Sequence, residues 1–303
     1  MKKILFILAL CLCTLACLFS CAQKSDFTYE EIEGGISITG YVGTEQNVII
    51  PEQIGKNTVI AISEAAFDMG SMTSITVPDT VKTIEKYAFR RCKNLTNIKL
   101  PEGLTEIADG LFTFCTALHT ITLPDSVELI DENAFGSSSI VSINLPEGLK
   151  VVGDFAFFNC TYLATVTGGE NVQTLSKQAF SNCISLTSIE LSESIKTIGP
   201  NCFDGCNSLK SITLPSSIDT LQMGVFSHTA LESITLPEGI KYIESYAFES
   251  CKSLKDIYIP DSVERMDANI FNETRGFTIH GTRDMQGEIY ADTYGYKFAE
   301  WVK

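Results

Sequence analysis

Apolar and polar positions repeat along most of the chain with a period of 22 or 23 residues. The clearest marker is a phenylalanine that follows a small or apolar residue. A proline closes an apolar segment in most periods, where it ends a strand by withholding a backbone donor, and Gly169 and Ser192 replace it. This regularity predicts a solenoid of about ten stacked repeats. The repeated phenylalanines are Phe67, Phe89, Phe112, Phe135, Phe157, Phe180, Phe203, Phe226, Phe248 and Phe271.

One period, residues 95–117, illustrates the elements that the pattern predicts. Two short strands and a helical turn fit it, and no single period can bury its own apolar face. Stacked periods can, and ten strands at ~4.8 Å each make a rod of about 48 Å. The residues expected to point inward are Leu95, Ile98 and Leu100 in the first strand, Leu104 and Ile107 in the second, and Phe112 and Cys115 in the turn.

The cysteines follow the same register. Cys92, Cys115, Cys160, Cys183, Cys206 and Cys251 each lie three residues after a repeat phenylalanine, and Cys202 directly precedes one. Metal sites use ligands at short spacings, whereas these recur once per turn. We therefore expect buried free thiols and no metal site.

The N-terminus has the layout of an export signal. Lys2 and Lys3 precede an apolar run that ends before Ser20 and Cys21, and the run is shorter than the ~20 residues of a membrane span. The segment resembles a bacterial lipoprotein signal, which implies lipidation of Cys21. Cys17 is an alternative lipidation site, and an ordinary secretory signal is a third interpretation. The lipid would be the only membrane attachment.

The repeat itself resembles a known family. Its pattern, Leu-x-x-Ile-x-Leu-Pro followed by Ile-x-x-x-Ala-Phe-x-x-Cys, is similar to the leucine-rich repeats of BspA-like bacterial surface lipoproteins, also found in Treponema, over residues 59–271. The resemblance extends to an opening hairpin over 27–41 and a closing segment over 281–298. It implies a right-handed leucine-rich repeat superhelix, displayed on the bacterial cell surface or outer membrane, that binds proteins or mediates adhesion.

The predicted domain organisation follows from these features. It comprises a lipoprotein signal peptide at 1–21, a polar tether at 22–30, an N-terminal hairpin cap at 31–58, the leucine-rich repeats at 59–280 and a C-terminal cap at 281–303.

Composition and charge narrow the range of partners. The chain is 45% hydrophobic with a formal net charge of −15, and removing the leader leaves 20 basic against 37 acidic residues, or −17. Nucleic acids and anionic lipids bind largely through Lys and Arg that neutralise phosphates. The charge therefore argues against both, and an extracellular or envelope protein is the expected partner.

Strand alternation identifies the residues that could face a ligand on a concave sheet. Nine outward pairs, from Ser74 and Thr76 to Asp256 and Tyr258, contain twelve Ser or Thr residues among eighteen. Hydroxyl ladders suit sheet pairing, whereas binding hot spots are rich in Trp, Tyr and Arg. Most of this face is thus expected to be structural, and the exceptions that could select a partner are Lys99, Glu190, Asp256 and Tyr258.

A second candidate is an aromatic patch made of Phe114, Phe155, Phe158 and Tyr162, for which packing beneath the turn is the alternative. The single tryptophan, Trp301, is expected to seal the last turn.

No catalytic motif is visible. The three histidines, His119, His228 and His280, fall in different periods, so convergence of acid, base and nucleophile is not expected. We predict no enzyme activity and no cofactor. The leading hypothesis is a cell-surface lipoprotein that binds proteins. The alternative is a carbohydrate-binding or envelope-architectural scaffold.

Overall fold

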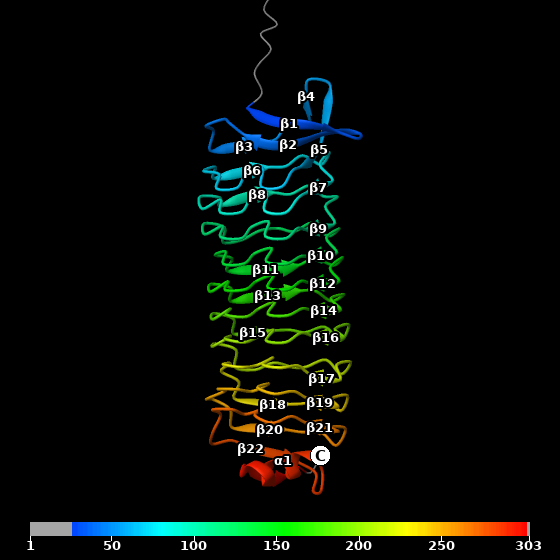
Figure 1. Ribbon diagram of the computed structural model, residues 1–303, viewed down its shortest axis with the longest axis vertical. Helices are drawn as coiled ribbons and strands as arrows, with labels where there is room; N and C mark the ends of the chain where they lie inside the picture. Colours follow the sequence, from blue (N-terminus) through cyan, green and yellow to red (C-terminus); the bar gives the residue numbers. More distant parts are fainter. Residues whose placement is uncertain (1–25, 302–303) are drawn as a thin grey trace, which may run out of the picture.

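The computed structural model describes residues 26–301, which form a β-solenoid of about 12 turns. Figure 1 shows the turns stacked into an upright column with β1 at one end and α1 at the other. The predicted signal peptide, Cys21 and Cys17 lie outside the described residues. Within residues 26–301, no helix combines the length and apolar character that a membrane span needs.

The N-terminal end is capped by hairpins. Strand β1 (Phe27–Ile32) pairs antiparallel with β2 (Gly35–Tyr41), which pairs in parallel with β5 (Asn57–Ile62), and β4 (Gln53–Ile54) folds back antiparallel on β5. Residues 27–30, assigned to the tether from sequence, therefore belong to the hairpin. The Phe27 ring lies 5.2 Å from that of Tyr41, and Tyr41 lies 6.3 Å from Phe67, so these rings extend the repeat core.

The first strand of each repeat builds a surface that we call the strand face. Its strands pair in parallel within three sheets. The sheets are interrupted at residues 119–122 and 210–213, which form no strand. The strands are β3 (Asn47–Ile49), β6 (Ser74–Thr76), β8 (Asn97–Lys99), β11 (Ser142–Leu145), β13 (Thr165–Gly168), β15 (Ser188–Ile189), β18 (Ser233–Thr235), β20 (Asp256–Tyr258), β22 (Thr278–Gly281) and β23 (Lys297–Glu300).

The second strand of each repeat lies on another side of the column, which we call the second ladder. These strands are β7 (Thr83–Ile84), β9 (Glu106–Ile107), β10 (Leu129–Ile130), β12 (Val151–Val152), β14 (Thr174–Leu175), β16 (Thr197–Ile198), β17 (Thr220–Leu221), β19 (Tyr242–Ile243) and β21 (Arg265–Met266). The strands β9, β10, β12, β14 and β16 form one parallel sheet there, β17, β19 and β21 form another, and β7 pairs with β5.

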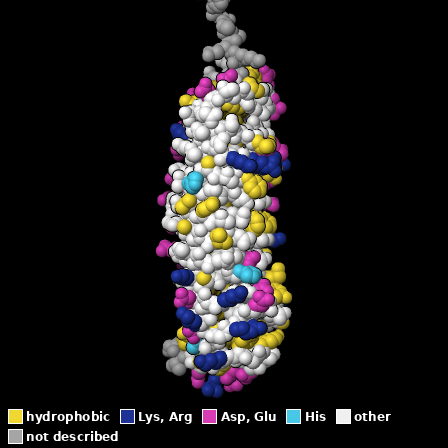
Figure 2. All heavy atoms as spheres, turned by 90° about the vertical axis from the view of Figure 1, so that its left-hand side faces the viewer, with side chains coloured by type: hydrophobic (Ala, Val, Ile, Leu, Met, Phe, Trp, Pro, Cys, Tyr) yellow, Lys and Arg dark blue, Asp and Glu magenta, His cyan; other side chains and the backbone are white. Residues whose placement is uncertain are grey.

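The column shows no marked bend in either of two views a quarter turn apart (Figures 1 and 2). The expected concave sheet is therefore close to flat along the rod. The reason is that both ladders rise by one strand spacing per turn, about 4.8 Å, so neither side of the solenoid is longer than the other.

The repeat phenylalanines form a continuous stack through the core. All ten are buried, and the ring centroids of neighbours lie 5.2 to 5.8 Å apart. The inward set predicted for residues 95–117 is likewise buried. This confirms the register derived from the sequence period.

The segment around each phenylalanine, expected to be a helical turn, consists of short hydrogen-bonded turns instead. Two residues per repeat, two positions before and two positions after the phenylalanine, have φ between 50° and 73°. In one repeat these are Phe155 and Asn159 on either side of Phe157. A left-handed residue interrupts the run of right-handed torsions that a helix requires. The turns are therefore tight but not helical.

The seven described cysteines are all free and buried. The six that follow the repeat phenylalanine donate from Sγ to the phenylalanine carbonyl of the preceding turn at 3.0 to 3.3 Å. Thr274 occupies the same position after Phe271 and donates to the Phe248 carbonyl at 2.7 Å. The cysteines are thus small hydrogen-bond donors that link successive turns.

The C-terminal end is closed by helix α1 (Gln286–Tyr294) and strand β23. Tyr290 is buried, with its ring 5.9 Å from that of Phe271, and its hydroxyl accepts a hydrogen bond from the Ile270 N–H at 3.2 Å. Tyr296 also packs on Phe271, at 5.6 Å between ring centroids. These side chains shield the last phenylalanine of the stack from water.

Candidate binding surface

Along the strand face, side chains alternate between the core and solvent. On β13, for example, Thr165 and Thr167 are exposed and Val166 between them is buried. Some outward polar groups bond across turns, such as the Thr167 hydroxyl, which donates to Asn144 Oδ1 at 3.0 Å. Much of the strand face is therefore a ladder of hydroxyl and amide groups.

Two of the four predicted residues on this face stand alone. Lys99, at the end of β8, lines a shallow hollow of about 370 Å³ with Thr122 and Asp125. Glu190 lines another, of about 430 Å³, with Thr165 and Thr167 on the neighbouring strand. Four repeats separate Lys99 from Glu190, so the structure does not bring them into one site.

The other two, Asp256 and Tyr258, lie in a cluster at the C-terminal end of the strand face. Strand β20 pairs with β22 so that Tyr258 is opposite His280, and the two rings stack with centroids 4.4 Å apart. His280 Nε2 lies 2.7 Å from Asp256 Oδ1. The Trp301 ring approaches Tyr258 edge-on at 5.3 Å, and its backbone N–H donates to the Gly281 carbonyl at 2.8 Å. We call Asp256, Tyr258, His280 and Trp301 the C-terminal aromatic cluster.

Two members of this cluster were missed by the sequence analysis. His280 occupies the outward position one period after Tyr258, so extending the alternation by one more strand would have found it. Trp301 lies in the non-periodic closing segment, where no pattern predicts its direction. The expected seal over the last phenylalanine is formed by Tyr290 and Tyr296, whereas the Trp301 ring packs on the outward side, against Tyr258.

Sequence and structure comparisons identify the family of this solenoid. The model for the BspA-type leucine-rich repeat region matches residues 60–187 and 174–285, with six copies. The chain belongs to the BspA-type leucine-rich repeat family. None of the curated proteins compared with the chain matches it.

Solved structures of bacterial leucine-rich repeat proteins have the same fold. A leucine-rich repeat protein from Bacteroides ovatus is 29% identical, with a TM-score of 0.78, and the match covers 85% of this chain and 70% of that protein. A leucine-rich repeat protein from T. pallidum is 32% identical, with a TM-score of 0.57 over 61% of this chain and 89% of that one. The BspA-type fold is thus established for this chain.

The predicted aromatic patch is only partly assembled on the BspA-type scaffold. Phe155 and Phe158 contact each other edge to face at 5.8 Å, and Lys177 Nζ lies 5.5 Å from the Phe155 ring centre. Phe114 and Tyr162 are 43% and 60% exposed, and neither makes a ring contact within residues 26–301. Of the four predicted residues, ring contacts thus join only Phe155 and Phe158.

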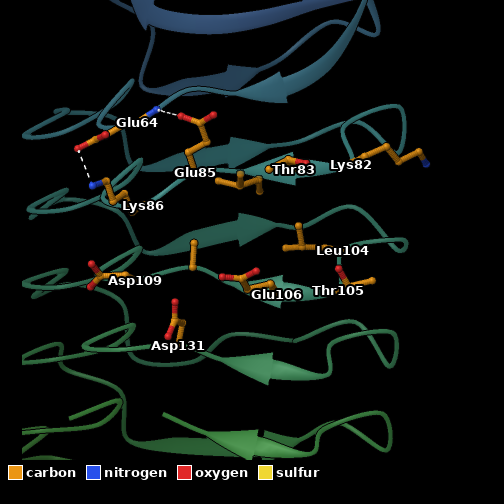
Figure 3. A pocket seen from close by; sticks show the side chains of 12 residues that line it. Glu64, Lys82, Thr83, Glu85, Lys86, Leu104, Thr105, Glu106, Asp109 and Asp131 are labelled. Atoms are coloured by element: carbon orange, nitrogen blue, oxygen red, sulfur yellow. Dashed lines mark hydrogen bonds and ion pairs between the residues drawn. The ribbon is translucent and has the colours of Figure 1, made fainter. Parts of the chain in front are cut away.

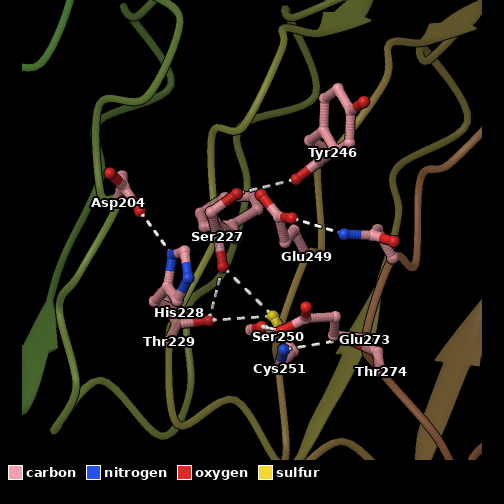
Figure 4. Close-up of polar contacts among 12 residues, drawn as sticks. Asp204, Ser227, His228, Thr229, Tyr246, Glu249, Ser250, Cys251, Glu273 and Thr274 are labelled. Atoms are coloured by element: carbon pink, nitrogen blue, oxygen red, sulfur yellow. Dashed lines mark hydrogen bonds and ion pairs between the residues drawn. The ribbon is translucent and has the colours of Figure 1, made fainter.

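The histidines lie in separate turns of the BspA-type solenoid. His228 Nδ1 is 2.9 Å from Asp204 Oδ1 in the preceding turn, as Figure 4 shows. Neighbouring contacts in that view also join successive turns, including Asn272 to Glu249 at 2.6 Å and Ser250 to Glu273 at 3.0 Å. These pairs bind one turn to the next. Across the described residues, no three His, Cys, Asp or Glu side chains are grouped as metal ligands.

Another hollow, of about 540 Å³, lies on the second ladder, away from the strand face. Figure 3 shows acidic side chains along it, with Lys86 Nζ 3.5 Å from Glu64 and the Glu64 N–H donating to Glu85 at 2.8 Å. Burial, together with the adjacent Asp131 carboxylate, raises the pKa of Glu106. This acidic surface was not predicted, although Glu64 and Asp109 share the position three residues before the repeat phenylalanine, and Glu85 and Asp131 share the position four residues before it.

Proposed function

We propose that this chain is a cell-surface lipoprotein, attached through Cys21, that binds an extracellular or envelope protein through the C-terminal aromatic cluster. The observation that carries the proposal is the convergence of Tyr258, His280 and Trp301 on the outward side of the last strands. Tyrosine and tryptophan are the side chains most enriched at binding hot spots, where they supply large apolar area at low conformational cost. Elsewhere the outward positions are mainly short hydroxyl side chains.

The proposed anchor agrees with the position of the cluster. Lipidation of Cys21 would hold the chain at its N-terminal end, only a few residues before β1. The C-terminal aromatic cluster would then stand at the end of the column farthest from the membrane. Adhesion of a cell to a partner protein requires such an exposed position.

Attachment and exposure can be tested together. Intact cells that express the protein are treated with a protease, in parallel with a Cys21→Ala variant, and the N-terminal peptide is examined by mass spectrometry. We expect release of the solenoid from intact cells and a lipid on Cys21. Protection from the protease, or an unmodified Cys21, would contradict the proposed surface lipoprotein.

Binding is tested with a panel of purified extracellular and envelope proteins, measured by biolayer interferometry. We expect at least one partner whose affinity falls tenfold or more in Tyr258→Ala, because hot-spot truncation costs more than about 1.4 kcal/mol. Tyr242→Ala, on the second ladder, is the matched control and should bind normally. Absence of any bound protein, or equal loss in both variants, would refute a protein-binding role for the cluster.

A carbohydrate-binding or architectural scaffold is the second candidate, favoured by the hydroxyl ladder along the strand face. It predicts binding on a glycan array that persists at high salt and is insensitive to Tyr258→Ala.

A further inference from the structure

A further hollow lies at the start of the last two strands, beside the C-terminal aromatic cluster. It has a volume of about 470 Å³, within the range of small-ligand sites. We call it the C-terminal hollow, and its principal lining residues are Arg275, Thr278, Tyr294, Tyr296 and Lys297.

The charge of this hollow is opposite to that of the molecule. Its lining includes a guanidinium and an ammonium group and no carboxylate, although the chain has a formal net charge of −15. Arg275 donates to the Thr274 carbonyl at 2.8 Å, and neither Arg275 nor Lys297 forms an ion pair within residues 26–301. Figure 2 shows Lys and Arg side chains interspersed with Asp and Glu over the lower, C-terminal part of the face that it presents.

Capping of helix α1 does not account for both cations. The helix ends at Gly295 in the left-handed conformation, and the N–H groups of Gly295 and Tyr296 already donate to the Ala291 carbonyl. A cation near a helix C-terminus stabilises it modestly through the helix dipole. Lys297 can serve in this way, whereas Arg275 comes from a different turn, before β22.

Strand register connects the hollow to the aromatic cluster. Thr278 on β22 is opposite both Asp256 on β20 and Lys297 on β23, and His280 lies two residues further along the same strand. An extended ligand that contacts Tyr258 and His280 would therefore reach the hollow by running along β22 toward the start of that strand. In addition, β23 is the last strand of its sheet, so within the described residues no strand pairs with its outer edge. An unpaired edge can accept an extended peptide.

We propose that the C-terminal hollow binds carboxylate side chains of an extended acidic peptide segment of the partner protein. Arg275 binds a carboxylate through paired N–H donors, Lys297 adds a second positive charge, and the tyrosine and threonine hydroxyls supply further donors. This inference rests on the proposed protein-binding function, to which it adds the chemistry of the partner.

The direct test uses a fluorescein-labelled hexaglutamate peptide, titrated with the full chain in a neutral detergent and followed by fluorescence anisotropy. We expect saturable binding that weakens at least tenfold in the double variant Arg275→Gln/Lys297→Gln. The matched control is Lys196→Gln/Lys241→Gln, which changes the net charge equally at exposed sites on the second ladder. The control should bind within twofold of the unmodified chain.

Each alternative has its own outcome. Equal weakening in both double variants would overturn the inference, because the effect would come from overall charge. Binding of oligogalacturonate in place of hexaglutamate would assign the hollow to an acidic saccharide and overturn the peptide assignment. No binding of hexaglutamate would also overturn it.

Failure of this inference is distinguishable from failure of the proposed function. A panel protein that binds in a Tyr258-dependent way while hexaglutamate does not bind leaves the proposed function intact. If the double variant unfolds, Arg275→Lys keeps the charge and removes only the paired donors, and it should lose affinity at least threefold. Unchanged affinity in Arg275→Lys would contradict the role given to Arg275.

Discussion

At the scale of single residues, the core is organised by one phenylalanine per turn and, in seven of the ten turns, by a small donor three positions later. The phenylalanine supplies buried apolar area, and the cysteine or threonine three positions later donates to the phenylalanine carbonyl of the preceding turn. Both the ring stacking and the hydrogen bond join one turn to its neighbour. A change at either position therefore affects two neighbouring turns.

Replacing Phe180 by Ala should lower the free energy of unfolding by about 3–5 kcal/mol, because it removes a fully buried ring from the middle of the stack. Guanidinium unfolding followed by circular dichroism measures this. The control is Phe114→Ala, whose side chain is 43% exposed and should cost far less. Similar losses in both variants would contradict the core stack.

The cysteine thiols should not react with alkylating reagents in the folded chain. Burial raises the pKa of Cys160 to about 12 and that of Cys251 to about 11, from an ordinary value of 9.0. Because the thiolate is the reactive form, iodoacetamide at pH 8 should leave all seven cysteines after Cys21 unmodified, as judged by peptide mass spectrometry. Denaturant should make all seven reactive.

The same pKa shifts make the free energy of unfolding depend on pH. In the unfolded chain these thiols ionise near pH 9, whereas in the folded chain they stay protonated up to about pH 11 or 12. The unfolded state therefore loses protons first, and the stabilising contribution is intact below pH 9 and lost as pH rises through the folded pKa. Unfolding midpoints measured from pH 7 to 11 should fall above pH 9. A flat profile would contradict thiol burial.

At the scale of secondary structure, each repeat depends on two left-handed residues as much as on its strands. The strands and their inward residues could be predicted, because alternation and a 23-residue period leave one register that buries the apolar set. The left-handed positions could not be predicted, because the residue two positions before the phenylalanine differs from repeat to repeat. It is Ala65, Tyr87, Asn133 or Gln178 in four of them. No residue type marks the site, since tertiary packing imposes the conformation.

Gly224 tests this view of the turn. Its φ is +63°, and a Cβ there would also meet Asn201 Oδ1 of the preceding turn. Gly224→Ala should therefore destabilise the chain by about 2–3 kcal/mol, combining about 1–2 kcal/mol for the left-handed backbone with the steric contact. Gly55→Ala is the control, because its φ is +65° and nothing lies within 4 Å of the added atom. Equal effects on the thermal midpoint would show that the contact between turns contributes nothing.

At the scale of the whole molecule, the sequence predicted the solenoid, its family, its opening hairpin and two residues of the C-terminal aromatic cluster, Asp256 and Tyr258, but not the C-terminal hollow. The period specifies the repeats because each turn packs only on its neighbours. The C-terminal aromatic cluster combines two periodic residues, Tyr258 and His280, with Trp301 from the closing segment. The C-terminal hollow likewise requires Lys297 from outside the repeats. Sites of this kind arise where periodicity stops, so period analysis alone does not find them.

The straightness of the column has a further consequence for how such proteins change over evolutionary time. Because both ladders rise together, inserting or deleting one repeat moves the two ends apart or together by about 4.8 Å along the axis without bending the rod. The terminal structures at either end need not change. The number of repeats therefore sets the length of the column. Duplication or loss of a repeat in the gene changes the distance between a terminal surface and the point of attachment.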